Sequence, residues 1–218
     1  MSTYPNSPRL VKGALIGVDV FNPVASVVVF QYNPDTMTRR LEARAAAGDG
    51  DRGEAQRLTG PPKETITLTV EIDATDRLEA GDAVTEKLGI YPELSSLEMM
   101  LYPKTAEVIA NEVLAAIGTI EILPMEQPFI LLVWGLRRVV PVRVTAFSIT
   151  EESYDPNLNP IRAKVELTLT VLTYQDYGVL HPGHWVFMAH QTAKEVMATI
   201  GGVRSMSDIR SIVPEVIL

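Results

Sequence analysis

The clearest pattern in the chain is the alternation of apolar and polar residues between Phe129 and Tyr174. Side chains of a strand point to opposite faces in turn, so a period of two predicts a strand with one buried face. In one strand Ala163, Val165, Leu167, Leu169 and Val171 share one side, and Lys164, Glu166, Thr168 and Thr170 share the other. In the strand before it, Val140, Val142, Val144 and Ala146 lie opposite Arg143 and Thr145. The pattern predicts consecutive strands of one antiparallel sheet.

A stiff, well-defined loop is predicted between these two strands, over Glu151–Pro160. This segment contains Asp155-Pro156 and Asn159-Pro160, and a residue before proline is pushed towards extended or turn geometry. Further strands are predicted at Thr65–Asp73, which alternates cleanly, and at Thr36–Arg44. A β-hairpin is predicted over Lys12–Phe30, where β-branched residues flank Asn22-Pro23.

Three segments have a helical period instead. Pro92 suits a first helical turn, and Leu94, Leu97 and Leu101 follow at helical spacing. A second helix is predicted at Lys104–Ile117, with Ile109, Val113 and Ile117 on one face. A carboxy-terminal helix is marked by Trp185, Met188, Ala189, Thr192, Val196 and Ile200, and we expect Gly201-Gly202 to end it. Ala45–Lys63, rich in Gly and charge without periodicity, is predicted to be a mobile loop.

The composition of the chain excludes several classes of protein. With 218 residues, of which 46% are hydrophobic and 21% charged, the chain can bury a sizeable core as one domain. A net charge of -8 without a Lys/Arg cluster argues against nucleic-acid binding. The absence of cysteine excludes disulfides and thiolate chemistry. Because Met1–Leu10 has no apolar run behind a basic start, we expect no signal peptide, synthesis in the cytoplasm and no membrane insertion.

The search for reactive groups finds no specific constellation. His181, His184 and His190 are close in sequence, but a six-residue separation on a helix points the last two to different faces, so surface or helix-start roles are expected. Adjacent acids such as Glu151-Glu152, and those around Asp73–Asp76, are expected to be solvated, and Arg137-Arg138 to lie on a turn. Gly48–Gly53 lacks the residues of a phosphate or calcium loop. We expect no catalytic residue, metal or cofactor.

Several separate motifs, in order, resemble the contractile injection system tube protein family. They are Phe30–Arg40 (FQYNPDTMTRR), Thr65–Glu79 (TITLTVEIDATDRLE), Leu88–Pro103 (LGIYPELSSLEMMLYP), Val133-Trp134-Gly135, Val139–Tyr154 and Asp155–Leu172. The resemblance covers most of Gly13–Tyr174.

The resemblance implies an α+β, β-dominated fold like that of phage tail tubes: an antiparallel β-barrel or sandwich with packed helices and a C-terminal helix. It implies a tube-like domain at residues 1–174, with the loop 45–63 and a helical section 74–123, and a helix and tail at 175–218. Longer relatives carry a LysM module, and here a helix and short tail take its place.

The function implied by the resemblance is that of a non-enzymatic component of a six-fold ring at the baseplate of a phage-tail-like particle. It would initiate or adapt the inner tube and join it to the central spike or hub. Its implied partners are other copies of itself, the inner tube protein or a second tube initiator, the spike or hub, and baseplate proteins. Retention in the cell and release of the particle both remain open.

Three alternatives remain open: a major tube subunit, a small-ligand or carbohydrate-binding β-domain using the histidine segment, and an enzyme such as a wall hydrolase. Two segments are predicted to make subunit or ring-to-ring contacts. Their residues are Gly48, Asp49, Asp51 and Arg52 in the first, and Glu151, Glu152, Tyr154, Asp155, Asn157 and Asn159 in the second.

Overall fold

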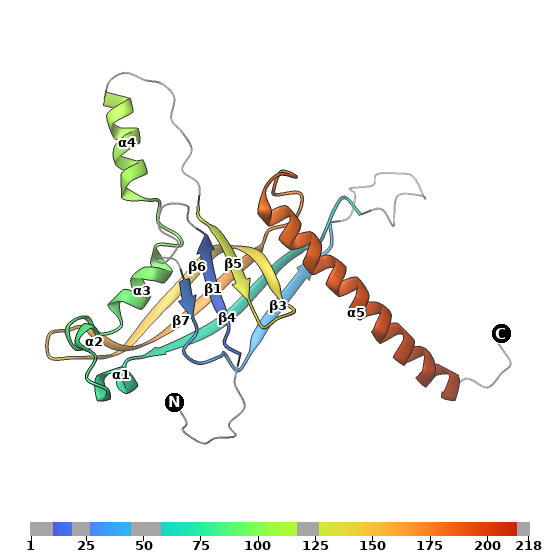
Figure 1. Cartoon of the computed structure of the whole chain (residues 1–218), viewed down its shortest axis with the longest axis horizontal. Helices are drawn as coiled ribbons and strands as arrows, with labels where there is room; N and C mark the ends of the chain where they lie inside the picture. The colour runs from blue at the N-terminus through green and yellow to red at the C-terminus, as the bar shows by residue number, and fades with distance from the viewer. Residues whose placement is uncertain (1–10, 19–26, 45–57, 117–126, 213–218) are drawn as a thin grey trace.

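Seven antiparallel strands form a single sheet in the computed structural model (Figure 1), which describes residues 11–18, 27–44, 58–116 and 127–212. The strands are β1 (Ala14–Val18), β2 (Val27–Val29), β3 (Met37–Glu42), β4 (Lys63–Asp73), β5 (Phe129–Val133), β6 (Val139–Tyr154) and β7 (Pro160–Val171). Their order is β2-β1-β5-β6-β7-β4-β3. The α+β, strand-dominated class is confirmed. The described sheet is open, with β2 and β3 at its edges, and is neither a closed barrel nor a pair of sheets.

The core lies on the face predicted by the alternation in β4 and β7. All five apolar positions of β7 are at most 4% exposed, and Ile66, Leu68, Val70 and Ile72 of β4 are buried beside them. Leu15 of β1 and Leu132 of β5 belong to the same buried cluster. Asp73 N at the end of β4 donates to Gln31 Oε1, just after β2, at 3.0 Å, so the sheet curls and brings its two halves around one core.

A β-bulge interrupts β6 at Thr145 and changes the predicted pattern. Val144 pairs with Leu169 and Ala146 with Thr168, so Thr145 is the extra residue of the bulge. Ala146 is consequently exposed, and the prediction that it shares the buried side with Val144 is wrong. Phe147 and Ile149 pack against the core in its place.

Four short helices connect β4 to β5: α1 (Thr75–Glu79), α2 (Ala83–Leu88), α3 (Tyr91–Glu98) and α4 (Thr105–Ala116). Asp82 caps α2 by accepting a hydrogen bond from Thr85 N at 3.1 Å. Pro92 lies in the first turn of α3, whose Leu94 and Leu97 are buried in the core as predicted. In contrast, α4 has no buried residue and stands away from the sheet (Figure 1).

The C-terminal helix α5 (Pro182–Ile212) differs from the prediction in length and in orientation. Gly201 and Gly202 lie inside it, because each glycine disfavours a helix by only about 1 kcal/mol and the next proline of the sequence, Pro214, comes only after Ile212, where the helix ends. Up to Ser205, the last residue whose side chain is described, Phe187 and His190 are its buried side chains, whereas the predicted face exposes Trp185, Val196 and Ile200. Among the described helices, none combines the length and apolar character that a membrane span requires.

The orientation of α5 depends on Gly183 in its first turn. A Cβ atom there would lie 2.6 Å from Tyr177 Cε2 and 2.9 Å from Phe129 Cε2, so only glycine lets the helix approach the sheet this closely. Beyond its first turns the helix leaves the body of the molecule (Figure 1).

Candidate assembly surfaces

One face of the sheet carries polar side chains from three neighbouring strands. This polar face is formed by Ser148 and Thr150 of β6, by Lys164, Glu166, Thr168 and Thr170 of β7, and by Thr65, Thr67, Thr69 and Glu71 of β4, which lie opposite one another in the strand register. All of these side chains are partly or fully exposed. Over β4, β6 and β7 the sheet thus has one apolar, buried face and one polar face that contacts water, whereas Val18, Val27 and Val29 of β1 and β2 expose apolar side chains.

Charges on the polar face are paired across strands. Lys164 Nζ lies 2.9 Å from Glu152 Oε1 and 3.9 Å from Glu71 Oε1. The hydrogen bond and the charge of Glu152 raise the pKa of Lys164. Arg162 Nε lies 3.6 Å from both Asp73 Oδ2 and Glu152 Oε2. Glu152 and Asp73, two of the acids considered for catalysis, are therefore partners of cations.

The tip of the β6–β7 hairpin is a short loop, residues 155–159, held by Asp155. Its Oδ1 accepts hydrogen bonds from Asn157 N at 2.7 Å and Asn159 N at 2.8 Å, and its Oδ2 accepts one from Asn159 Nδ2 at 2.8 Å. Leu158 has a φ of 64°, in the left-handed region. The loop is well defined, as predicted, but β6 extends to Tyr154, so the loop is half as long as the predicted segment.

Helices brace this hairpin tip at its base. Ile90 N donates to Pro160 O at 2.8 Å, and Asn159 Nδ2 donates to Lys87 O at 3.1 Å. These contacts leave Glu151, Tyr154, Asn157 and Leu158 open to solvent. The tip is a rigid, exposed projection.

The first predicted contact segment can be located only in part. Gly48, Asp49, Asp51 and Arg52 lie outside the described residues, as do the remaining positions from 45 to 57. Residues 58–62 were included in the predicted mobile loop, but Thr59 N donates to Arg44 O at 2.9 Å, and Thr59 O accepts from Gln175 Nε2 at 2.8 Å. The C-terminal end of that predicted loop is therefore hydrogen-bonded to the body of the protein.

Asp155 makes the hairpin tip sensitive to pH. The hydrogen bond from the Asn159 side chain, with the backbone N–H bonds, lowers the pKa of Asp155 below its usual value. A carboxyl with a depressed folded pKa contributes stability that is complete above its unfolded pKa of about 3.9 and is lost as the pH falls through the folded value. We expect Asp155→Ala to be less stable than the natural chain at pH 7 and the difference to shrink below about pH 4. Urea unfolding at both pH values measures this, and a pH-independent difference would contradict it.

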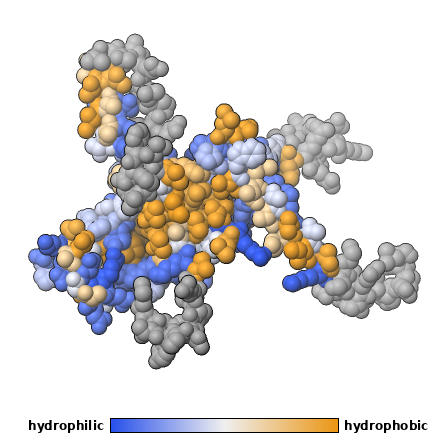
Figure 2. Space-filling view, viewed as in Figure 1, coloured by the Kyte–Doolittle hydropathy of each residue, from blue (hydrophilic) through white to orange (hydrophobic). Residues whose placement is uncertain are grey.

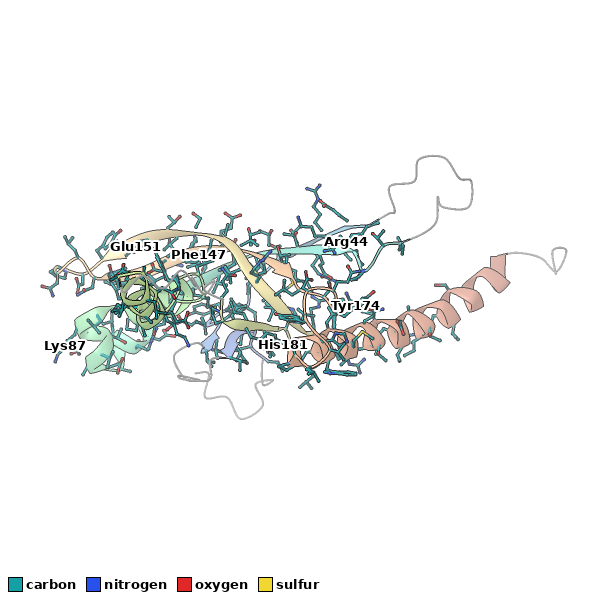
Figure 3. The ribbon with its side chains drawn as sticks, turned by 90° about the horizontal axis from the view of Figure 1, so that it is seen from above. Arg44, Lys87, Phe147, Glu151, Tyr174 and His181 are labelled. Atoms are coloured by element: carbon teal, nitrogen blue, oxygen red, sulfur yellow. The ribbon has the colours of Figure 1, made fainter. Side chains whose placement is uncertain are left out.

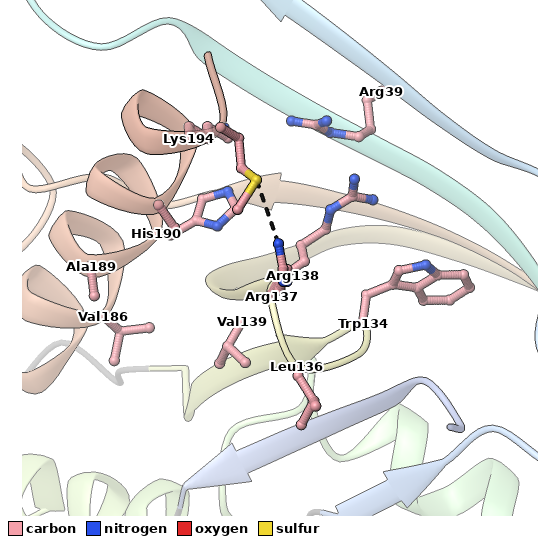
Figure 4. A pocket seen from close by; sticks show the side chains of 12 residues that line it. Arg39, Trp134, Leu136, Arg137, Arg138, Val139, Val186, Ala189, His190 and Lys194 are labelled. Atoms are coloured by element: carbon pink, nitrogen blue, oxygen red, sulfur yellow. Dashed lines mark hydrogen bonds between the residues drawn. The ribbon is translucent and has the colours of Figure 1, made fainter. Parts of the chain in front are cut away.

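A groove of about 770 Å³ separates α5 from the turn between β5 and β6 (Figure 4). We call it the α5 groove. It is lined by Arg39, Trp134, Leu136, Arg137, Arg138, Val139, Val186, Ala189, His190, Ala193, Lys194 and Met197. Local sequence places Arg137 and Arg138 only on a turn, because the α5 residues that face them, Val186 to Met197, come much later in the chain.

The three histidines lie in different environments, and the ring of His184 packs edge-on against those of Tyr174 and Trp185. His181 Nδ1 accepts a hydrogen bond from Gly183 N at 3.0 Å at the start of α5, and its ring stacks on Tyr177. This is the helix-start role that was predicted. His190 is buried, so a surface position is wrong for it, and burial lowers its pKa to about 4. In the described part of the chain, no cluster of three His, Asp or Glu side chains is arranged to hold a metal ion.

A profile of the contractile injection system tube protein family matches residues 19–177, more than half of the chain. The chain belongs to this family. The family comprises structural tube proteins rather than enzymes. No curated protein sequence matches the chain.

Among solved structures, this tube protein is similar to a chain of the virion of a native gene transfer agent particle. The two sequences are 10% identical, and the superposition has a TM-score of 0.27. It covers 73% of this chain and 90% of that chain. A similarity this low supports no argument. The family match includes β2 to β7 and α1 to α4, whereas β1 and α5 lie outside it.

Proposed function

We propose that this tube protein forms a ring that initiates or adapts the inner tube at the baseplate and connects it to the central spike or hub. The observation that carries the proposal is the two-faced sheet, which buries one side in its own core and keeps a polar face uncovered. In a closed ring of such sheets, the polar face borders the water-filled channel, while the exposed strand edges are covered by neighbouring copies.

The positions of the two predicted contact segments support stacking along the ring axis. Glu151 and Lys87 lie at one end of the molecule, and Arg44 lies towards the other (Figure 3). The register agrees, because Glu42 pairs with Lys63 at one end of β4 while Asp73 pairs with Arg162 at the other. One segment therefore leaves from each end of the sheet, as contacts to different rings require.

An initiator and a major tube subunit differ in copy number. For an initiator, we expect purified particles to contain about one ring's worth of this chain, against many rings of the tube protein. Densitometry of the particle proteins, with spike and sheath bands as internal standards, measures the ratio. A dominant band would instead make this chain the major tube subunit.

Particle structure tests the placement directly. In a cryo-EM map of the baseplate region, the hairpin tip and the segment 45–63 should both contact another subunit or ring. A map with both segments free in solvent would contradict this part of the proposal. Normal full-length particles in a strain lacking the gene would exclude an initiating role.

A further inference from the structure

The helix α4 exposes an apolar, acidic surface. Ile109 and Val113, one turn apart, are 53% and 55% exposed, and Figure 2 shows apolar residues gathered on this helix. Glu107 and Glu112 are its charged residues, and none of its twelve residues is basic. A short, isolated helix of this kind gains most of its stability from packing, so an apolar face without a partner indicates contact with another molecule.

The α5 groove has the complementary chemistry. Leu136, Val139, Val186, Ala189, Ala193 and Met197 supply its apolar lining, and four cations, Arg39, Arg137, Arg138 and Lys194, surround it (Figure 4). Arg39 and Lys194 share the carboxylate of Glu64, at 2.6 Å and 3.3 Å. Arg137 and Arg138 have no carboxylate partner among the described residues; each donates to a methionine sulfur at 3.5 Å.

We propose that α4 of one copy docks in the α5 groove of a second copy. Ile109 and Val113 contact the apolar lining, and Glu112, which flanks this pair on the helix, pairs with Arg137 or Arg138. The helix α4 stands apart from α5 (Figure 1), so a chain in this conformation does not place its own α4 in its own groove. The helix is about 18 Å long, at 1.5 Å per residue, which suits a groove that follows three turns of α5.

Such a contact joins two different surfaces, and repeating it produces a closed ring or an open stack. It rests on the proposed ring-forming function and adds the residues that join the copies. The contact between copies and the ring-forming function can be disproved independently. The contact is tested with the purified chain, and the function is tested by the incorporation of the chain into particles.

Cysteine cross-linking tests the contact, since the chain has no cysteine of its own. We expect a mixture of Val113→Cys and Ala189→Cys chains to form a disulfide-linked dimer under mild oxidation. Each variant alone should form at least tenfold less, because the proposed contact places neither residue against itself. Both positions are exposed, so both variants should fold, which circular dichroism can verify. No mixed dimer, or equal dimer from Val113→Cys alone, would overturn the proposal.

Charge reversal supplies the matched control. In the Val113→Cys chain, Glu112→Lys should reduce the mixed cross-link at least fivefold, and Arg137→Glu with Arg138→Glu in the Ala189→Cys chain should restore it. Glu86→Lys changes the net charge equally at an exposed position of α2, and it should have no effect. An equal loss in this control would show that net charge alone controls association, and a failure to restore the cross-link would contradict the proposed charge pairing.

Discussion

Replacing Leu167 with alanine is expected to lower the free energy of unfolding by about 3 kcal/mol. Leu167 is 1% exposed in the middle of β7, between Leu68 of β4 and Phe147 of β6. The substitution removes buried methyl groups and leaves a cavity that two flanking strands cannot easily fill. Urea unfolding followed by circular dichroism measures the change.

Thr168→Ala is the matched control for this experiment. Thr168 is the next residue of the same strand, but it lies on the polar face opposite Thr67, so its loss should change stability by about 0.5 kcal/mol or less. Equal effects at the two positions would mean that both faces of β7 are buried. This would contradict the two-faced sheet.

Gly89→Ala is expected to destabilise the protein by about 3 kcal/mol or more. Gly89 ends α2 with a φ of 58° and a ψ of -133°, a conformation that essentially only glycine adopts. In addition, a Cβ atom there would overlap the carbonyl oxygen of Pro160, which accepts the hydrogen bond from Ile90 N. Both α2 and the base of the hairpin tip would have to move. Thermal unfolding of the two proteins measures the loss.

Gly81→Ala distinguishes backbone strain from the close contact with Pro160 as the cause of the destabilisation. Gly81 also has a positive φ, 71°, but no atom lies within 4 Å of the position of its missing Cβ. Backbone strain alone should therefore cost about 1 kcal/mol at Gly81. If Gly89→Ala were no more harmful than Gly81→Ala, the close contact with Pro160 would not matter to stability.

The strands could be predicted because apolar residues alternate with polar ones along them, and the apolar residues are those that face the core. Val165 and Leu169 show this in β7, and Ile66 and Val70 in β4. The bulge at Thr145 could not be predicted, because it depends on how β6 pairs with β7. The order of apolar and polar residues around Thr145 does not indicate it. Alternation alone placed Ala146 inside, where the structure places Phe147 and Ile149.

The C-terminal helix shows a second limit. Its length was underestimated because a glycine pair is also a common helix end, and the cost of two helical glycines is small beside the packing of a long helix. Its buried face was misassigned because Trp185 and Val196 suggested an apolar stripe. The contact is instead made around Gly183, whose small size permits the approach.

The geometry of the candidate assembly surfaces was predictable only where their residues are neighbours in the sequence. Asp155 and the two prolines around it predicted a rigid hairpin tip from sequence alone. The α5 groove combines Arg39, Arg137 and Lys194, which are far apart in the chain and meet only in the folded protein.

The bulge in β6 affects the curvature of the sheet but not which apolar residues of the strand face the core. Deleting Thr145 would bring Ala146 and Phe147 into the unbroken alternation that begins at Val140, with Phe147 still directed inward. The composition of the core would be unchanged, while the bend and added twist of a bulge would be lost. A single-residue deletion or insertion at this point would therefore change the shape of the subunit, and with it the angle between copies in the proposed ring, without a change of the residues in the core.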